Sequence, residues 1–334
     1  MTTDEIGARQ MRAAVVTEFG GTDVIEVQDW PEPAAGPGQV LVDIELTDLI
    51  FVETAIRKGQ HGGFFDVKPP YVPGNSFGGV VRSVGPDVDE QWIGRTVLGR
   101  TIDFAAHAEL GVAAVGEIVE VPAELNLETA VAVFGDGFTS LLLEQLAPAL
   151  QGKEVLITAA AGGMGVLLVQ LAHKAGAHVI AAARGQAKLD LVKAQGADVV
   201  IDYSVPGWEK LVLDATNNQG IDVGLEGAGG ELGAVAFSTL KDGGWFSAHG
   251  APSGGFAAYD PAEAERRGIT VKGIMDLRVD NRAITVTGED VLERALQGDL
   301  IPVIDRTFAL DQLGEAHTAV EDRTLLGKAL IRIR

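Results

Sequence analysis

Hydrophobic and polar positions divide the chain into a first part of short apolar runs, a middle part of alternating segment types and a mixed end. Residues 40–46, VLVDIEL, alternate apolar and polar with a period of two. Prolines and glycines, as in PEPAAGPGQ, separate the neighbouring runs. Alternation between turn-forming residues is typical of strands. We therefore predict a β-rich first part, with strands in MRAAVVTEF, VLVDIEL, GGVVRSVG, GRTVLGR and VGEIVEVP.

From about Leu127 the pattern alternates between strand-like and helix-like segments. Buried strands are predicted in KEVLITA, HVIAAA, DVVIDY, IDVGLEGAG and GWFSAHG. Helices are predicted at residues 139–150 and 187–195 and in GVLLVQLAHKAGA, WEKLVLDATNNQ and ELGAVAFSTL. Strict alternation of this kind predicts a doubly wound parallel sheet with helices on both faces. After about Leu277 the segments are mixed, and the closing GKALIRIR predicts a strand that pairs with the first part.

Length and charge narrow the classes of function. A chain of 334 residues is long enough for two domains. Its formal net charge of -21 repels phosphate backbones, so we expect no nucleic-acid partner, although solubility alone also explains such a surface. No apolar run reaches the ~18 residues of a membrane span, and the N-terminal MTTDEIGARQ is polar and acidic. We expect a cytoplasmic protein that does not bind a membrane.

The chain contains no cysteine, which excludes disulfides, thiolate nucleophiles and cysteine-based zinc sites. No two of the six histidines stand three or four residues apart, so no helical metal pair is visible. We therefore predict no metal site.

The segment ITAAAGGMGVLLVQLA carries the clearest ligand-binding motif. Ala160, Gly162 and Gly165 occupy the key positions of G-x-G-x-x-G, with alanine first, between a predicted strand and a predicted helix. Glycines there allow a pyrophosphate and the helix to approach closely, and the helix N-terminus favours phosphate charge. We predict dinucleotide binding; a close-packed turn without a ligand is the alternative. The predicted cofactor-binding residues of this loop are Ala160, Gly162, Gly163, Met164, Gly165 and Val166.

The end of the second strand of this series indicates which dinucleotide binds. NAD-specific sites usually place a carboxylate there for the ribose hydroxyls. Here the strand ends Ala182-Ala183-Arg184-Gly185, and Lys188 follows one turn later. Two cations can hold a 2′-phosphate through charge-assisted hydrogen bonds, and Arg184 could also stack on adenine. We predict NADPH as the cofactor; a solvated helix start is the alternative.

These segments, together with VPGNSFGGVVRSVGPDV and the terminal GKALI, resemble the medium-chain dehydrogenase/reductase superfamily, and within it the zinc-free quinone oxidoreductase (zeta-crystallin-like) branch. The resemblance implies an α/β protein with two domains. A GroES-like β-rich catalytic domain is expected at residues 1–133, with residues 277–334 returning to it. A Rossmann-type NADPH-binding domain is expected at residues 134–276. The family commonly forms homodimers through the last strand of the dinucleotide sheet, for which GWFSAHG is expected.

The resemblance also explains why the site should lack zinc. Zinc-dependent members carry Gly-His-Glu where this chain has Gly74-Asn75-Ser76, and their first cysteine ligand falls at about Ile50. Their four-cysteine lobe has no counterpart between Gly94 and Ala106. Alcohol oxidation through a zinc alkoxide is therefore not expected.

The remaining chemistry is hydride delivery to a small-molecule substrate, a quinone or an α,β-unsaturated carbonyl, whose oxygen gains negative charge that hydrogen-bond donors can stabilise. Asn75, Thr139 and Tyr71 are the predicted catalytic residues. Thr139 matches a family threonine near the nicotinamide, or it is a helix N-cap. Tyr71 is a proton donor or a packing residue, and water or a ribose hydroxyl could replace it.

The segment Asp48-Leu49-Ile50-Phe51 departs from the Gly-Val-Asn-Pro-like segment usual in the branch and makes the expected pocket more apolar. The predicted substrate-pocket residues are Ile50, Phe51, Ser76 and Phe138. Aromatic walls would suit a flat acceptor, although each ring could equally belong to the core. The candidate rings are Phe64, Phe65, Phe77, Phe134 and Phe138.

The remaining cofactor contacts follow from the resemblance. Tyr203 matches a tyrosine near the adenosine phosphate, unless it is an aromatic on the surface at a strand end. Gly227, Gly250 and Ala251 are expected beside the nicotinamide. His249 is expected to be a loop or interface residue, and Asp136 and Glu53 structural carboxylates.

We expect an NADPH-dependent, zinc-independent reductase of quinones or activated alkenes that forms a homodimer. Three alternatives stay open: an enoyl-thioester reductase, a tailoring reductase of secondary metabolism, and a non-catalytic NADPH-binding sensor. Fold alone does not identify the acceptor.

Overall fold

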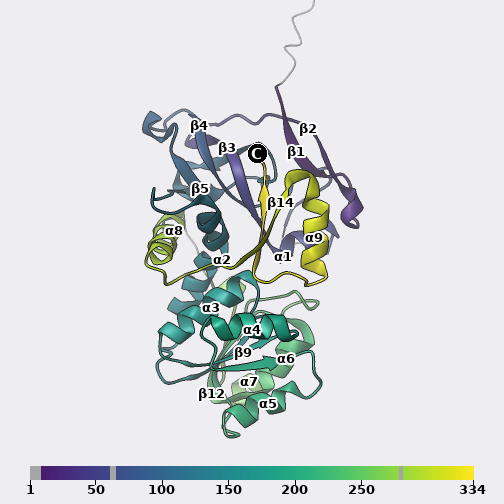
Figure 1. Ribbon diagram of the computed structural model, residues 1–334, viewed down its shortest axis with the longest axis vertical. Coiled ribbons are helices and arrows are strands. Elements are labelled where there is room, and N and C mark those ends of the chain that lie inside the picture. The colour runs from purple at the N-terminus through teal and green to yellow at the C-terminus, as the bar shows by residue number, and fades with distance from the viewer. Residues whose placement is uncertain (1–8, 61–64, 278–280) are drawn as a thin grey trace, which may run out of the picture.

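A mixed sheet forms the upper half of the molecule in Figure 1, and both ends of the chain contribute to it. The computed structural model describes residues 9–60, 65–277 and 281–334. The strand order of the mixed sheet is β14-β15-β3-β4-β5-β7, with β6 paired to β3. The strands are β3 (Gln39–Leu49), β4 (Ser76–Val84), β5 (Thr96–Arg100), β6 (Leu110–Ala114), β7 (Ile118–Glu120), β14 (Ile304–Ala309) and β15 (Lys328–Arg332). A hairpin of β1 (Gln10–Val16) and β2 (Ile25–Pro31) lies beside them.

The predicted return of the C-terminal strand is confirmed. Strand β15 pairs antiparallel with β3, with Ala329 opposite Leu49, and parallel with β14. Its consecutive apolar residues Leu330 and Ile331 point to opposite faces of the sheet, and both are fully buried. The last residues of the chain therefore lie inside the sheet that the first part begins.

The predicted parallel sheet is also confirmed, in the order β10-β9-β8-β11-β12-β13. Its strands are β8 (Glu154–Thr158), β9 (His178–Ala183), β10 (Val199–Asp202), β11 (Ile221–Glu226), β12 (Leu240–Ala248) and β13 (Thr270–Gly273). The helices around it are α3 (Gly163–Lys174), α4 (Gln186–Ala194), α5 (Trp208–Ala215), α6 (Gly230–Ser238) and α7 (Pro261–Arg266).

Helices cover both faces of this sheet, which explains its continuous apolar strands. Val155 and Ile157 pack in the cluster with Val169 of α3, whereas Leu156, between them, packs with Val212 of α5 on the other face. Successive strand residues point to opposite faces, so a sheet covered on both sides needs apolar residues at every position.

The predicted limits of one helix and the predicted edge strand of the parallel sheet were wrong. The helix expected at residue 139 is α2 (Leu127–Leu146), whose N-cap Asn126 accepts the N–H of Thr129. Thr139 is therefore mid-helix, and its hydroxyl donates to the Gly135 carbonyl, so it is not an N-cap. Two glycines interrupt the apolar pattern there, and burial of the helix outweighs their low helix propensity.

The expected edge strand was misplaced as well. GWFSAHG belongs to β12, and β13 pairs along its outer side, with Trp245 opposite Thr270. The short TVKG segment carried too little apolar character to predict this strand from its sequence. A pairing that extends the sheet would therefore use β13.

Helix α2 connects the two sheets. Together with α8 (Asn281–Leu296), it packs in one apolar cluster with Leu46 of β3, Leu330 of β15 and Leu167 of α3. The boundary expected between residues 133 and 134 falls inside α2. Two further helices, α1 (Phe51–Arg57) and α9 (Leu313–Glu321), pack against each other beside the mixed sheet.

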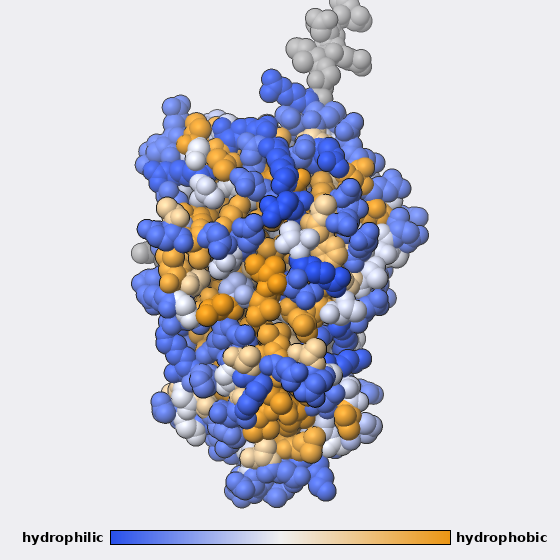
Figure 2. All heavy atoms as spheres, in the orientation of Figure 1, coloured by the Kyte–Doolittle hydropathy of each residue, from blue (hydrophilic) through white to orange (hydrophobic). Residues whose placement is uncertain are grey.

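The surface view places hydrophilic residues around the rim of this face and hydrophobic residues along its middle (Figure 2). Within the described part of the chain, no helix is both long and apolar enough to span a membrane.

Candidate active site

The glycine loop between β8 and α3 has the geometry of a phosphate-binding turn. Gly162 is the N-cap of α3 and is exposed, whereas Gly163 and Met164 are half-buried. A Cβ on Gly165 would lie 2.3 Å from the Ala159 carbonyl oxygen, so only glycine lets the helix pack this closely. The free N–H groups at this helix start favour an anion.

Two loop residues predicted to bind cofactor serve the fold directly. Ala160 and the side chain of Val166 are fully buried in the core. The Val166 N–H donates to the Gly162 carbonyl within α3. The loop therefore presents its backbone from Gly162 to Met164 to solvent.

Three cationic side chains meet near the end of β9. Arg184 is exposed there, and Lys188 Nζ donates to the Arg323 carbonyl at 2.7 Å. Burial, followed by the charges of Arg323 and Arg184, lowers the pKa of Lys188. Arg323 was not predicted, because it follows α9, more than a hundred residues along the chain from Arg184. The group forms a concentrated positive site at the end of β9. One carboxylate lies beside it: Asp202, at the end of β10, accepts the N–H of Gly185 through Oδ2 at 3.1 Å. Side-chain hydrogen bonding and, to a lesser extent, the charge of Arg184 lower the pKa of Asp202.

Tyr203 lies next to these cations but is not on the surface. It directly follows β10, is 8% exposed, and packs edge-on against Trp208 at 6.3 Å between ring centroids. The expectation that this residue could be a surface aromatic was therefore wrong. Burial raises the pKa of its phenol, so the hydroxyl stays protonated.

Two loops come together at the carboxyl ends of β11 and β12. A Cβ on Gly250 would lie 1.9 Å from the Gly227 carbonyl oxygen, so this contact requires glycine. His249 follows β12, is buried, and its Nδ1 shares a hydrogen bond with Ser247 Oγ at 2.6 Å. Burial lowers the pKa of His249 to about 4, so the ring is neutral near pH 7. Ala251 continues this loop.

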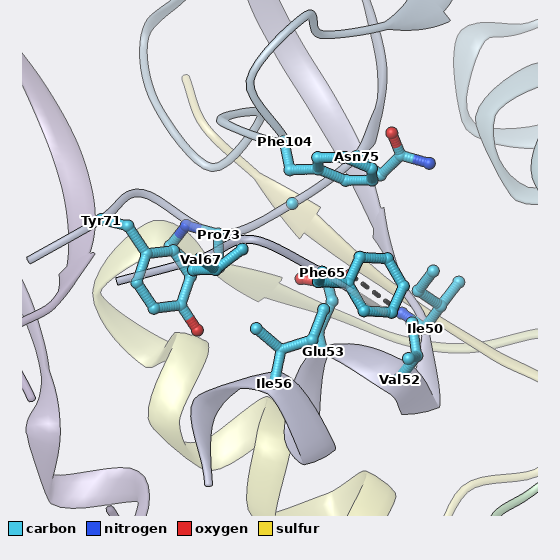
Figure 3. Close-up of a pocket in the computed structure, with 11 residues that line it drawn as sticks. Ile50, Val52, Glu53, Ile56, Phe65, Val67, Tyr71, Pro73, Asn75 and Phe104 are labelled. Atoms are coloured by element: carbon cyan, nitrogen blue, oxygen red, sulfur yellow. Dashed lines mark hydrogen bonds between the residues drawn. The ribbon is translucent and has the colours of Figure 1, made fainter. Parts of the chain in front are cut away.

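A cavity of about 120 Å³ opens between α1 and the segment before β4 (Figure 3). An apolar cavity of about 150 Å³ binds benzene, so this space is slightly smaller than one known to hold a small ring. Four predicted residues, Ile50, Phe65, Tyr71 and Asn75, line it. The lining side chains are Ile50, Val52, Glu53, Ile56, Phe65, Val67, Tyr71, Pro73, Asn75 and Phe104, together with Gly74.

Aromatic rings form part of the cavity wall. Phe65 and Phe104 meet edge-to-face, with centroids 5.7 Å apart. Phe77 and Phe134 are 1% exposed and belong to the core. Phe64 lies outside the described residues. Phe104 was missed, because its loop has no periodic pattern.

The other predicted pocket and catalytic residues lie on α2, at the start of α1 or at the start of β4. Ser76 and Phe138 are buried, Phe51 is half-buried at the first position of α1, and Thr139 bonds within α2. Arg100, which sequence reasoning missed, places its guanidinium 4.9 Å from the centroid of the Phe138 ring. Phe138 is therefore covered by this cation.

A hydrogen-bonded chain extends behind Glu53 in the cavity wall. Glu53 Oε2 lies 2.9 Å from His107 Nε2, and His107 Nδ1 lies 2.7 Å from Thr47 Oγ1. Glu53 Oε1 accepts the N–H of Ile50 at 3.2 Å. Glu53 was expected to be structural, and these contacts fit that role; His107 was not predicted.

Lys328, Asp48 and Asp136 form a buried ionic cluster beside the glycine loop between β8 and α3. Lys328 Nζ is 2.7 Å from Asp48 Oδ2 and 2.9 Å from Asp136 Oδ2. Burial opposes its charge, but Asp136 and Asp48 outweigh it and raise the pKa of Lys328. A Cβ on Gly163 would meet Asp136 and Lys328, so this cluster touches the start of α3. Asp136 is a structural carboxylate, as predicted.

The residues at the expected metal position do not fit zinc. Ile50 has no donor atom, and Asn75 offers only an amide. Among residues 9–60, 65–277 and 281–334, no three His, Cys, Asp or Glu side chains are arranged to hold a metal ion.

Both halves of the chain match family models. The alcohol dehydrogenase GroES-like domain matches residues 36–131, and the zinc-binding dehydrogenase domain matches residues 163–285. With the fold above, these matches place the chain in the medium-chain dehydrogenase/reductase superfamily, in its quinone oxidoreductase branch. The chain is therefore an oxidoreductase that uses a nicotinamide cofactor.

Individual relatives are similar over nearly their whole length. A probable quinone oxidoreductase of Schizosaccharomyces pombe is 28% identical over 326 residues, 95% of each chain. A 2-haloacrylate reductase of a Burkholderia species is 27% identical, covering 96% of this chain and 98% of that protein. Mycobacterial Rv1454c complexed with NADPH has a TM-score of 0.89 and 27% identity, covering 97% of this chain and 100% of that one.

Proposed function

We propose that this protein is an NADPH-dependent, zinc-independent reductase of a quinone or a small α,β-unsaturated carbonyl compound. The cavity beside Asn75 carries the proposal, because it is small, mainly apolar and partly aromatic, and two hydrogen-bond donors, Tyr71 and Asn75, line it. Relatives named quinone oxidoreductase and 2-haloacrylate reductase support an electron-poor acceptor.

The polar groups of the cavity suit this reaction. When bound, the nicotinamide supplies a hydride to the acceptor. The Asn75 amide can donate a hydrogen bond to the acceptor oxygen, which gains negative charge. Tyr71 lies on the other side of the cavity, with its hydroxyl directed toward α1 (Figure 3). Burial is the main cause that raises the pKa of Tyr71, so the phenol is neutral and carries its proton, and donating that proton requires a strongly basic acceptor such as an enolate.

Arg184, Lys188 and Arg323 support NADPH over NADH. Burial lowers the pKa of Lys188, and the charges of Arg323 and Arg184 stand close enough to lower it further. Bringing them together costs free energy that a bound 2′-phosphate would offset. We propose that this group binds the 2′-phosphate and that Tyr203 packs beside the adenosine end.

The function is tested with purified, chelator-treated protein against quinones and enones, with either cofactor. We expect rapid NADPH oxidation, slow NADH oxidation and no effect of the chelator. Loss of turnover on chelation would contradict zinc independence. Cofactor binding without turnover would favour a sensor. Turnover only with enoyl thioesters would favour an enoyl-thioester reductase, and turnover only with one specialised substrate would favour a tailoring reductase.

We propose that residues 1–133 and 277–334 form the catalytic domain and residues 134–276 the cofactor domain. We further propose a homodimer in which β13 of two copies meets. This strand is the edge of the parallel sheet in the described chain, and Met275 just after it is 75% exposed. Exposed strand edges and large apolar side chains are typical of pairing surfaces.

Replacing Met275 with glutamate should therefore weaken the dimer. Burying a methionine side chain contributes about 1.5–3 kcal/mol, so the dissociation constant should rise about 10- to 100-fold. Light scattering at a series of concentrations measures it. Leu211→Glu, on α5, is the matched control because Leu211 is 48% exposed. An unchanged dimer in Met275→Glu, or a monomeric parent protein, contradicts the proposal.

A further inference from the structure

Unpartnered polar atoms gather behind the Tyr71 side of the cavity. Tyr71 Oη, Arg57 Nη1 and both ring nitrogens of His317 are buried and have no hydrogen-bond partner. These are four of the seven such side-chain atoms in the described residues. Arg57 and His317 are 0% exposed, so bulk water does not reach their side chains in this conformation.

These atoms belong to one neighbourhood. Arg57 is on α1 and His317 is on α9, and the two helices pack together. Burial is the first cause that lowers the pKa of His317, and the charge of Arg57 is the second. The charges of Glu53 and Arg57 likewise act on the Tyr71 phenol. The charge of Arg57 therefore acts both on Tyr71 at the cavity and on His317 on α9.

One end of this neighbourhood reaches solvent. Arg57 Nε donates to the Gly20 carbonyl, and its Nη2 donates to Glu321 Oε1 at 2.5 Å. Lys58 pairs with the same carboxylate at 2.9 Å, and its side chain is 36% exposed. The other end is the cavity, where Glu53 and Tyr71 form part of the wall.

Leaving buried polar groups unsatisfied costs about 1–3 kcal/mol each. Native proteins normally satisfy such groups with ordered water, which makes about three hydrogen bonds per molecule. The four unpartnered atoms of Tyr71, Arg57 and His317 therefore favour a small internal water cluster rather than four separate unsatisfied groups.

We propose that ordered waters join Tyr71, Arg57 and His317 into a path that brings protons from the Glu321–Lys58 edge to the cavity. This inference rests on the proposed reductase function. Hydride addition leaves an enolate or hydroquinone anion, which takes a proton as the Tyr71 O–H bond breaks. The phenolate takes a proton from water, that water takes one from a His317 N–H, and the other ring nitrogen accepts a proton from the solvent side in the same concerted transfer. His317 therefore stays neutral throughout, and each hydride consumes one solvent proton.

The surrounding residues fit these roles. His317 stays neutral because burial and the Arg57, His107 and Lys58 charges lower its pKa, and a neutral imidazole has one donor and one acceptor nitrogen. Arg57 can orient water through Nη1 and stays charged. Tyr71 would be a catalytic residue, whereas Arg57 and His317 are positioning and relay residues.

A crystal structure that resolves ordered water tests the proposed water cluster without any activity assay. We expect waters within about 3.2 Å of Tyr71 Oη, Arg57 Nη1 and a ring nitrogen of His317. A dry space, or direct protein hydrogen bonds to all these atoms, would overturn the proposal.

Enzyme kinetics test the proposed proton path. Tyr71→Phe should lower kcat for enone reduction about 100-fold, as expected for loss of a general acid, with little change in the KM for NADPH. His317→Phe should lower kcat less and raise the solvent deuterium isotope effect. His317→Gln covers the case where the Phe variant does not fold. Tyr259→Phe, a hydroxyl deletion at a ring stacked on Phe237, is the matched control.

The outcomes separate the two proposals. A parent protein without turnover would overturn the proposed function and the proton path while leaving the water cluster intact. Normal turnover with unchanged kcat and isotope effect in Tyr71→Phe and His317→Gln would overturn the proton path alone.

Discussion

Replacing Arg184 with alanine should raise the KM for NADPH about 10- to 100-fold and leave the KM for NADH nearly unchanged. A hydrogen bond between charged groups contributes about 1.5–3 kcal/mol, and the 2′-phosphate is the group that distinguishes the two cofactors. Arg184 is exposed, so its replacement removes this interaction without opening the core. Initial rates with each cofactor measure the effect.

Salt provides an independent check on this prediction. Added salt screens exposed charges, so it should raise the KM for NADPH in the parent protein more than in Arg184→Ala. Arg95→Ala is the matched control, since Arg95 is an exposed arginine paired with Glu120 on the mixed sheet. Equal changes in both KM values would show that Arg184 contacts a part shared by both cofactors, such as adenine.

Replacing Lys328 with methionine should lower the free energy of unfolding by about 3–5 kcal/mol. Its side chain is 4% exposed, and its ammonium bonds two carboxylates that lie on β3 and α2. Removing one member of a buried ionic cluster leaves the remaining charge uncompensated, which is the costly case. Denaturant unfolding followed by fluorescence measures the loss, with both sheets monitored in case they unfold separately.

Two further variants separate charge from packing. The triple variant Lys328→Met, Asp48→Asn, Asp136→Asn should recover most of the lost stability, because no uncompensated charge remains. Arg82→Met, which breaks an exposed pair with Asp43, should cost about 1 kcal/mol or less. A triple variant no more stable than Lys328→Met would show that the methylene packing of Lys328, and not its charge, supports the fold.

Local patterns predicted the parts of this protein that depend on neighbouring residues. The glycine loop, the parallel sheet and the returning C-terminal strand each have a signature within a few residues. The start of α2 was missed because its glycines break the apolar pattern, and its helical state depends on packing against both sheets. Strand β13 was missed because four weakly apolar residues form a strand only beside β12.

The candidate site shows the same difference between features set by neighbouring residues and features set by distant contacts. Arg184 and Asn75 stand in motifs, so their chemistry is visible from the chain. Arg323 joins Lys188 only after the C-terminal segment folds over the cofactor part. Similarly, His107 bonds Glu53 across 54 positions, and no sequence period reports such a distance. Contacts between distant segments supply the charge partners and the hydrogen-bond chain.

The position of β15 also determines when the protein can finish folding during synthesis. Residues 328–332 lie between β14 and β3, so the mixed sheet stays incomplete until these residues have left the ribosome. The parallel sheet, encoded by residues 154–273, is complete well before that point. Domains usually fold as units as they emerge. The middle of this chain should therefore fold first, and the sheet formed by the N-terminal strands should stay incomplete until residues 328–332 have emerged.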